Sequence, residues 1–163
     1  MSKKAFLNCL MPLVLAWTLL AVSCGAPDPR TLPNLVAQDL AITITQDDVA
    51  KTLKLCFSGT EKITVRNAGG AASEPFKILL GFYDQSSNLV SGAATELDSP
   101  RGLQSGMSLQ ASYLGQCLSV PFAKFRSGQT YFPGIFVNSN GAVLESTYGD
   151  NMLVLKNRPH VAP

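Results

Sequence analysis

The sequence predicts an all-β protein, an antiparallel β-sandwich of about seven or eight short strands. Three observations lead to this prediction: apolar and polar residues alternate from residue 35 onward, turn-forming segments separate the alternating stretches, and no amphipathic helix pattern follows residue 34. Many short strands with frequent turns in one domain are typical of two packed antiparallel sheets.

The first 23 residues have the organisation of a secretory signal peptide. Lys3 and Lys4 precede an apolar run over residues 5–22, and the small residues Ala21 and Ser23 stand just before Cys24. An uncleaved membrane helix is the alternative, and it needs about 20 apolar residues. Because the uninterrupted part of this run is shorter and a proline-rich segment follows it, we expect residues 1–23 to be removed.

Cysteine usage suggests a role for Cys24. The segment from Leu20 to Cys24 resembles a bacterial lipobox, in which a peptidase cuts before the cysteine and the thiol is acylated, although Ala21 stands where that family prefers leucine. The alternative is ordinary cleavage after Ser23. The exported chain would hold Cys24, Cys56 and Cys117, an odd number in an oxidising compartment. A lipid on Cys24 would anchor the protein to a membrane and leave Cys56 and Cys117 to form one disulfide.

Residues 24–33 are predicted to be a proline-rich, extended tether, because Pro27, Pro29 and Pro33 disfavour a helix. The sandwich is predicted over residues 34–156. Residues 157–163, which include His160, are predicted to be a disordered tail.

Charge and histidine content exclude several function classes. Without Lys3 and Lys4, Lys plus Arg falls from 13 to 11 and balances 11 Asp plus Glu, so the net charge is zero. A neutral chain without a Lys/Arg run lacks the features of a nucleic-acid binder. Because the one histidine is His160, neither a Ser-His-acid triad nor a Cys-His pair can be assembled. We therefore expect a protein that is not an enzyme and needs no cofactor.

The strands are expected in a regular succession. Alternation or strand-forming composition marks residues 40–45, 53–57, 62–66, 76–83, 108–113, 118–122, 131–137 and 152–155. Turn-forming residues separate them, most clearly at residues 67–70, 86–88, 127–128 and 138–141.

Four segments resemble, in order, motifs of the bacterial CARDB domain (cell adhesion related domain found in bacteria). The first is EKITVRNAGGAASEPFKILLGFYD, with a V-x-N-x-G turn between two strands; the others are RGLQSGMSLQASY, SGQTYFPGIFVNSNG and AVLESTYGDNMLVL. Asp150 departs from the closing motif, and Cys56 and Cys117 are not part of the usual pattern. The resemblance implies an immunoglobulin-like sandwich with a surface or adhesive role and no catalytic residues.

Three other features are expected to be structural. Asn67 can stabilise its turn, and Tyr131 suits a tyrosine corner, in which the ring is buried and the hydroxyl caps upstream backbone. Glu145, Asp150 and Asn151 offer oxygen ligands, but their spacing does not supply the six to eight that Ca²⁺ requires. We therefore expect no metal.

Recognition is expected in the loop predicted over residues 84–106, the longest stretch without sustained alternation. Leu89 would serve as an apolar anchor, with Asp98 and Arg101 in a polar rim, and the partner would be an envelope or extracellular protein. The alternative is that Leu89 begins a short edge strand and that Leu97 and Leu103 fill the end of the core.

Two other functions remain open. One is a carbohydrate-binding module that uses exposed tyrosines at Tyr83, Tyr113 and Tyr148. The other is a small hydrolase, which would require titratable groups that converge in a pocket.

Overall fold

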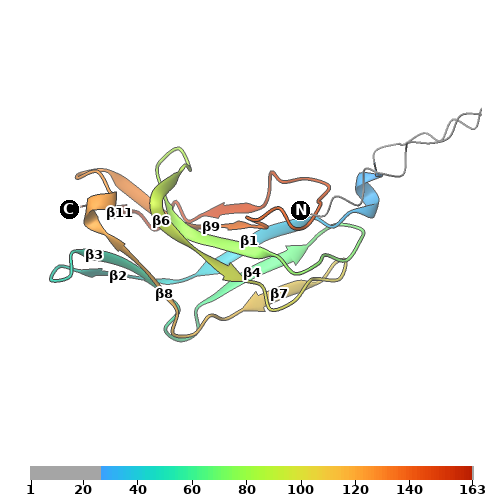
Figure 1. Cartoon of the computed structure of the whole chain (residues 1–163), viewed down its shortest axis with the longest axis horizontal. Helices are drawn as coiled ribbons and strands as arrows, with labels where there is room; N and C mark the ends of the chain where they lie inside the picture. The colour runs from blue at the N-terminus through green and yellow to red at the C-terminus, as the bar shows by residue number, and fades with distance from the viewer. Residues whose placement is uncertain (1–26, 163) are drawn as a thin grey trace, which may run out of the picture.

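The computed structural model describes residues 27–162, which form two packed antiparallel layers (Figure 1). One layer has two halves: β1 (Leu35–Ala41), β4 (Lys62–Asn67) and β7 (Ser108–Ala111), then β2 (Thr43–Asp47), β3 (Thr52–Cys56) and β8 (Cys117–Pro121). The other has the order β10 (Met152–Val154), β9 (Thr130–Val137), β5 (Lys77–Tyr83) and β6 (Leu89–Asp98), and β11 (His160–Val161) also pairs with β9. The described residues also contain two 3-10 turns, η1 (Pro29–Thr31) and η2 (Phe122–Lys124). The predicted β-sandwich is confirmed.

Alternation along the strands produces the core between the layers. Ile63 and Val65 of β4 belong to the same buried apolar cluster as Ile78, Leu80 and Phe82 of β5, and all five side chains are almost completely buried. Since successive residues of a strand point to opposite faces, the neighbours of the buried pair in β4, Lys62, Thr64 and Arg66, lie on the outer face of the layer and none of them is buried. Burial of this apolar surface is the main stabilising contribution, at about 25 cal/mol per Å².

Breaks within the first layer divide its long strands. The predicted strand 40–45 spans the end of β1 and the start of β2, which Ile42 separates. Ile42 is buried, and its carbonyl accepts a hydrogen bond of 2.5 Å from Arg158 Nη1. Similar breaks separate β3 from β4 and β7 from β8. The described residues therefore contain eleven short strands rather than seven or eight.

The prediction of a long loop over residues 84–106 is wrong. Most of it is β6, which pairs with β5 from Lys77↔Asp98 to Tyr83↔Leu89. Ala93 and Leu97 of β6 are buried, but an irregularity in the pairing between Gly81 and Tyr83 and a left-handed Gly92 (φ +71°) interrupt the alternation. This interruption hides a period of two in the sequence. Leu103, in the remaining loop, is buried in the core as the alternative predicted.

The predicted disulfide between Cys56 and Cys117 is confirmed. The two cysteines stand directly opposite each other on β3 and β8, with their Cα atoms 4.2 Å apart. The bond therefore joins neighbouring strands of one layer and does not cross the core. A disulfide of this kind is typical of proteins outside the reducing cytosol.

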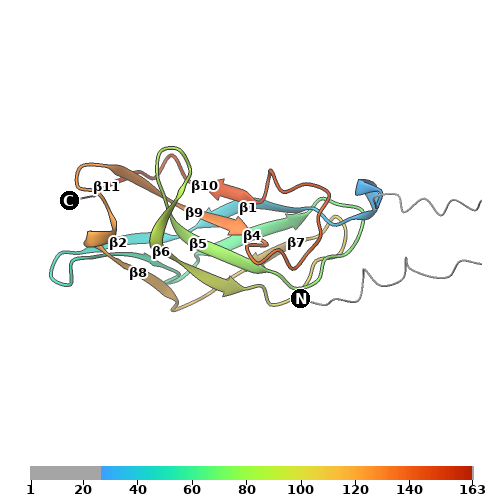
Figure 2. The same ribbon diagram turned by 45° about the horizontal axis from the view of Figure 1, so that its top comes forward.

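The two ends of the sandwich differ, as Figures 1 and 2 show. The η1 end comprises η1 and the loops 68–76, 99–107 and 138–151. The hairpin end comprises the β2–β3 turn 48–51, the β5–β6 turn 84–88 and the segment 122–129. Cys24 lies outside the described residues.

Both predicted terminal segments have structure where they are described. The tether prediction for residues 24–33 does not anticipate η1, which packs against the β4–β5 loop, with Gly70 N donating to Leu32 O at 3.0 Å. The prediction of a disordered tail over residues 157–163 is wrong for residues 160–162. His160 pairs with Tyr131, and Ala162 is buried, because the edge of β9 offers unpaired backbone groups at this point.

Candidate functional site

The predicted recognition residues do not form one site. Leu89 is at the hairpin end of β6, and Asp98 is the last residue of the same ten-residue strand, up to about 30 Å away at ~3.3 Å per residue. Arg101 lies beyond Asp98, in the loop of the η1 end. A single rim that combines Leu89, Asp98 and Arg101 is therefore wrong.

The charged side chains around Asp98 form exposed ion pairs on the surface of the sheet. Lys77 Nζ lies 3.2 Å from Glu96 Oε2 and 3.5 Å from Asp98 Oδ1. The hydrogen bond to Glu96 is the main reason that the pKa of Lys77 is raised above its ordinary value. Exposed cross-strand pairs such as these contribute at most about 1 kcal/mol.

The tyrosines do not form a sugar-binding platform. Tyr83 is only 1% exposed, and burial raises its pKa to about 12. Tyr113 packs on Phe57 and donates its hydroxyl to Asp98 O at 3.0 Å, while Tyr148 lies in the loop after β9. Because Tyr83 is buried and Tyr148 is at the η1 end, the coplanar exposed surface that the carbohydrate alternative required is absent from residues 27–162.

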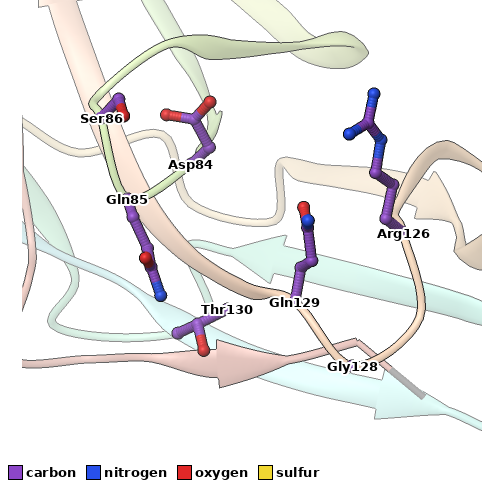
Figure 3. Close-up of a pocket in the computed structure, with 7 residues that line it drawn as sticks. All are labelled: Asp84, Gln85, Ser86, Arg126, Gly128, Gln129 and Thr130. Carbon is purple, nitrogen blue, oxygen red and sulfur yellow. The ribbon is translucent and has the colours of Figure 1, made fainter.

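A polar pocket of about 380 Å³ lies at the hairpin end. It is lined by Asp84, Gln85, Ser86, Arg126, Gly128, Gln129 and Thr130. Figure 3 shows the Gln129 side chain between the β5–β6 turn on one side and Arg126 on the other. Amide, hydroxyl and charged groups from two loops therefore converge on one concave surface, which we call the polar pocket.

One wall of the polar pocket is the turn that begins at Asp84. The Asp84 carboxylate accepts hydrogen bonds from Asn88 N at 2.9 Å and from Asn88 Nδ2 at 3.2 Å. The bond from the Asn88 backbone amide is the main cause that lowers the pKa of Asp84. Lys156 Nζ donates to the carbonyls of Asp84 and Gln85, at 3.2 and 2.7 Å, and fixes the turn to the segment after β10.

The other wall is a tyrosine corner, as the sequence predicted. The Tyr131 ring is buried 4.9 Å from that of Phe125, and its hydroxyl accepts a hydrogen bond of 2.8 Å from Arg126 N. Ala162 N donates to Gln129 O at 3.0 Å and holds the same loop from the C-terminal side. The backbone of this wall is thus fixed, while the Arg126 guanidinium forms no ion pair with any residue in the range 27–162.

The polar pocket was not predictable from the sequence, because its walls are two turns separated by about 40 residues. Each turn has a sequence signal, DQSSN at 84–88 and RSGQT at 126–130, that predicts only a local bend. Pairing of β5 with β9, which places Tyr83 opposite Phe132, brings the two turns together.

Glu145 and Asn151 form part of a buried polar network at the η1 end, whereas the half-buried Asp150 accepts a separate hydrogen bond of 3.0 Å from Asn34 Nδ2. One Glu145 oxygen accepts from Asn138 Nδ2 and Asn151 Nδ2, both at 2.7 Å, and the other accepts from Leu35 N. Burial is the main cause that raises the pKa of Glu145. The network connects the loop after β9 to the start of β1, so its role is structural.

Asn67 is also structural, as predicted. Its side-chain oxygen accepts from Asn34 N and Gly69 N, both at 3.0 Å, and its amide donates to the carbonyls of Ala71 and Leu103. Residues 27–162 contain no group of three or more His, Cys, Asp or Glu side chains suited to a metal. The same range has no helix with the length and apolar character of a membrane span.

Comparison with protein-family models and with curated proteins finds no match for this chain. Among solved structures, it is similar to the CARDB domain of a Pyrococcus furiosus protein, solved in complex with di-metal ions, at 14% identity and a TM-score of 0.37. The match covers 76% of this chain and 84% of that one, and it is to the family that the sequence motifs resemble.

A second similar structure is a β-glucuronidase from glycoside hydrolase family 2, at 10% identity and a TM-score of 0.45. The match covers 81% of this chain and 12% of that one, so it concerns a small part of the glucuronidase. Both likenesses extend to the sandwich fold alone.

Proposed function

We propose that this chain is an exported, lipid-anchored binding module of the bacterial envelope, held through Cys24, with an adhesive or structural role and no catalytic activity. The observation that carries the proposal is that η1 lies at one end of the sandwich and the two segments that line the polar pocket, 84–86 and 126–130, lie at the other (Figure 1). A lipid on Cys24 would then hold the η1 end near the membrane and present the polar pocket away from it.

The polar pocket suits recognition of a protein better than chemistry. Its walls are rigid at the backbone, while the exposed side chains of Gln85 and Arg126 form no hydrogen bond within the described residues. Arginine and amide side chains on a fixed scaffold are common in the polar parts of protein interfaces. The partner is a protein of the envelope or of the extracellular space.

Two measurements test the proposal separately. Intact-mass analysis of the purified protein should show a mature chain that begins at Cys24 with added acyl mass, and Cys24→Ala should abolish membrane fractionation. A mature chain without acyl mass would contradict the anchor.

Capture from intact envelopes tests the binding role. Arg126→Ala combined with Gln85→Ala should reduce capture of the partner at least tenfold without changing the melting temperature. The control is Arg66→Ala with Gln104→Ala, which removes the same residue types outside the polar pocket. Equal capture by the two double variants would exclude the polar pocket as the interface.

A further inference from the structure

The short connection between Cys24 and the folded domain limits how far the η1 end can stand from a lipid. Leu32 O accepts a hydrogen bond from Gly70 N at 3.0 Å, and a Cβ atom on Gly70 would lie only 1.8 Å from Arg30 O. The chain is thus packed against the sandwich from Arg30 onward. Six residue steps from Cys24 to Arg30 span at most about 22 Å at ~3.3–3.6 Å each.

Apolar side chains are exposed at this same end. Leu144 and Tyr148, in the loop after β9, are 62% and 48% exposed, and Met107, in the loop after β6, is 54% exposed. Ser146 N donates to Pro33 O at 3.0 Å, so the loop of Leu144 and Tyr148 contacts the segment that leads to Cys24. Met107 O accepts from Asn67 N at 2.9 Å, and Asn67 in turn bonds to Asn34.

The exposed charges at the η1 end are balanced, while the carboxyl groups of Glu145 and Asp150 in the loop 138–151 are buried and half-buried. Arg30 and Arg101 are exposed, as are Asp28 and Glu74. A surface with both signs is not repelled by a bilayer, and apolar contact then decides the interaction. Leucine favours the hydrocarbon region, and tyrosine is enriched at membrane–water interfaces.

We infer that the η1 end rests on the surface of a phospholipid bilayer, with Leu144, Tyr148 and Met107 in contact with the lipid. This inference depends on the proposed anchor at Cys24, and it adds a defined orientation of the domain. The acyl chains hold the protein at the membrane, and the three side chains keep the sandwich upright, with the β2–β3 turn pointing outward.

A single-tryptophan experiment tests the orientation. Trp17 is the one tryptophan of the sequence, so a chain that begins at Cys24 has none. Leu144→Trp places a probe at the η1 end. The matched control is Val49→Trp, because Val49 is 96% exposed in the β2–β3 turn. Residues 35–47, which comprise β1, Ile42 and β2, separate this turn from the η1 end by roughly 40 Å at ~3.3 Å per residue.

Each acylated variant is reconstituted into phosphatidylcholine vesicles with and without brominated acyl chains. We expect bromine to quench the fluorescence of Leu144→Trp several-fold more than that of Val49→Trp. Equal fluorescence of Leu144→Trp in both vesicles overturns the inference. A blue-shifted emission without quenching by bromine also overturns it, because the probe would then be buried against protein.

The mass spectrum of the same sample separates the two proposals. Acyl mass at Cys24 with no selective quenching overturns the orientation and leaves the anchor intact. A spectrum without acyl mass overturns the anchor, and the inferred orientation with it.

Discussion

Glu145→Gln should destabilise the fold, although it changes a single atom of a buried side chain. In the wild type, the three hydrogen bonds to the Glu145 carboxylate come from two asparagine amides and from Leu35 N. Glutamine replaces one accepting oxygen with an amide that can only donate. If its oxygen keeps the two asparagine bonds, its amide faces Leu35 N, and two buried donors oppose each other.

The size of the expected loss in the free energy of unfolding follows from the buried donors that Glu145→Gln leaves without an acceptor. Each buried donor without a partner costs about 1–3 kcal/mol. Relief of the burial penalty on the charged carboxylate, which raises the pKa of Glu145, offsets part of this cost. We therefore expect a loss of about 2–4 kcal/mol in the free energy of unfolding at pH 7, measured by urea denaturation and circular dichroism.

The pH dependence of stability provides a second test. Folding raises the pKa of Glu145. Between pH 4.5 and the folded pKa, the native protein therefore holds a proton that the unfolded chain has released. The free energy of unfolding falls as the pH rises through this range. This slope should be absent in Glu145→Gln. The control is Glu74→Gln, an exposed position where we expect a change within about 0.5 kcal/mol. Equal effects at both positions would refute the role of the buried network.

Three further predictions concern stability and ionisation. Cys56→Ala should lower the free energy of unfolding by about 4 kcal/mol, because the disulfide closes a loop with a sequence separation of 61. Adding Cys117→Ala should cost little more, because both substitutions remove the same bond, and additive losses in urea denaturation would contradict this. Thr43→Val should raise the pKa of Glu61 from about 2 toward 4.5 in an NMR titration, since the Thr43 hydroxyl is the main cause of the lowered value. An unchanged titration would exclude that hydrogen bond. Leu103→Ala should destabilise by about 2–5 kcal/mol, whereas Asp98→Ala with Arg101→Ala should change the free energy of unfolding by less than about 1 kcal/mol.

Local patterns were sufficient for much of the fold. Alternation in residues 62–66 and 76–83 predicted β4 and β5 because one face of each strand is buried, and burial selects apolar residues at every second position. The tyrosine corner at Tyr131 and the turn at Asn67 were also predictable, since each depends on contacts within a few residues or on a common strand–loop geometry. The odd cysteine count was enough to suggest the Cys56–Cys117 pair.

Other features depended on contacts between distant segments. The irregularity at Gly92 interrupts the alternation of β6, and only pairing with β5 shows that residues 89–98 form a strand. His160 reaches an ordered position because β9 has a free edge beside it. The polar pocket exists because β5 and β9 are neighbours, which brings together the turns that begin at Asp84 and end at Thr130. The sequence by itself determined the strands whose alternation is uninterrupted, together with their buried faces, because both follow from local periodicity. The tertiary structure decided β6, β11 and the site, because these depend on backbone and side chains that only strand pairing brings together.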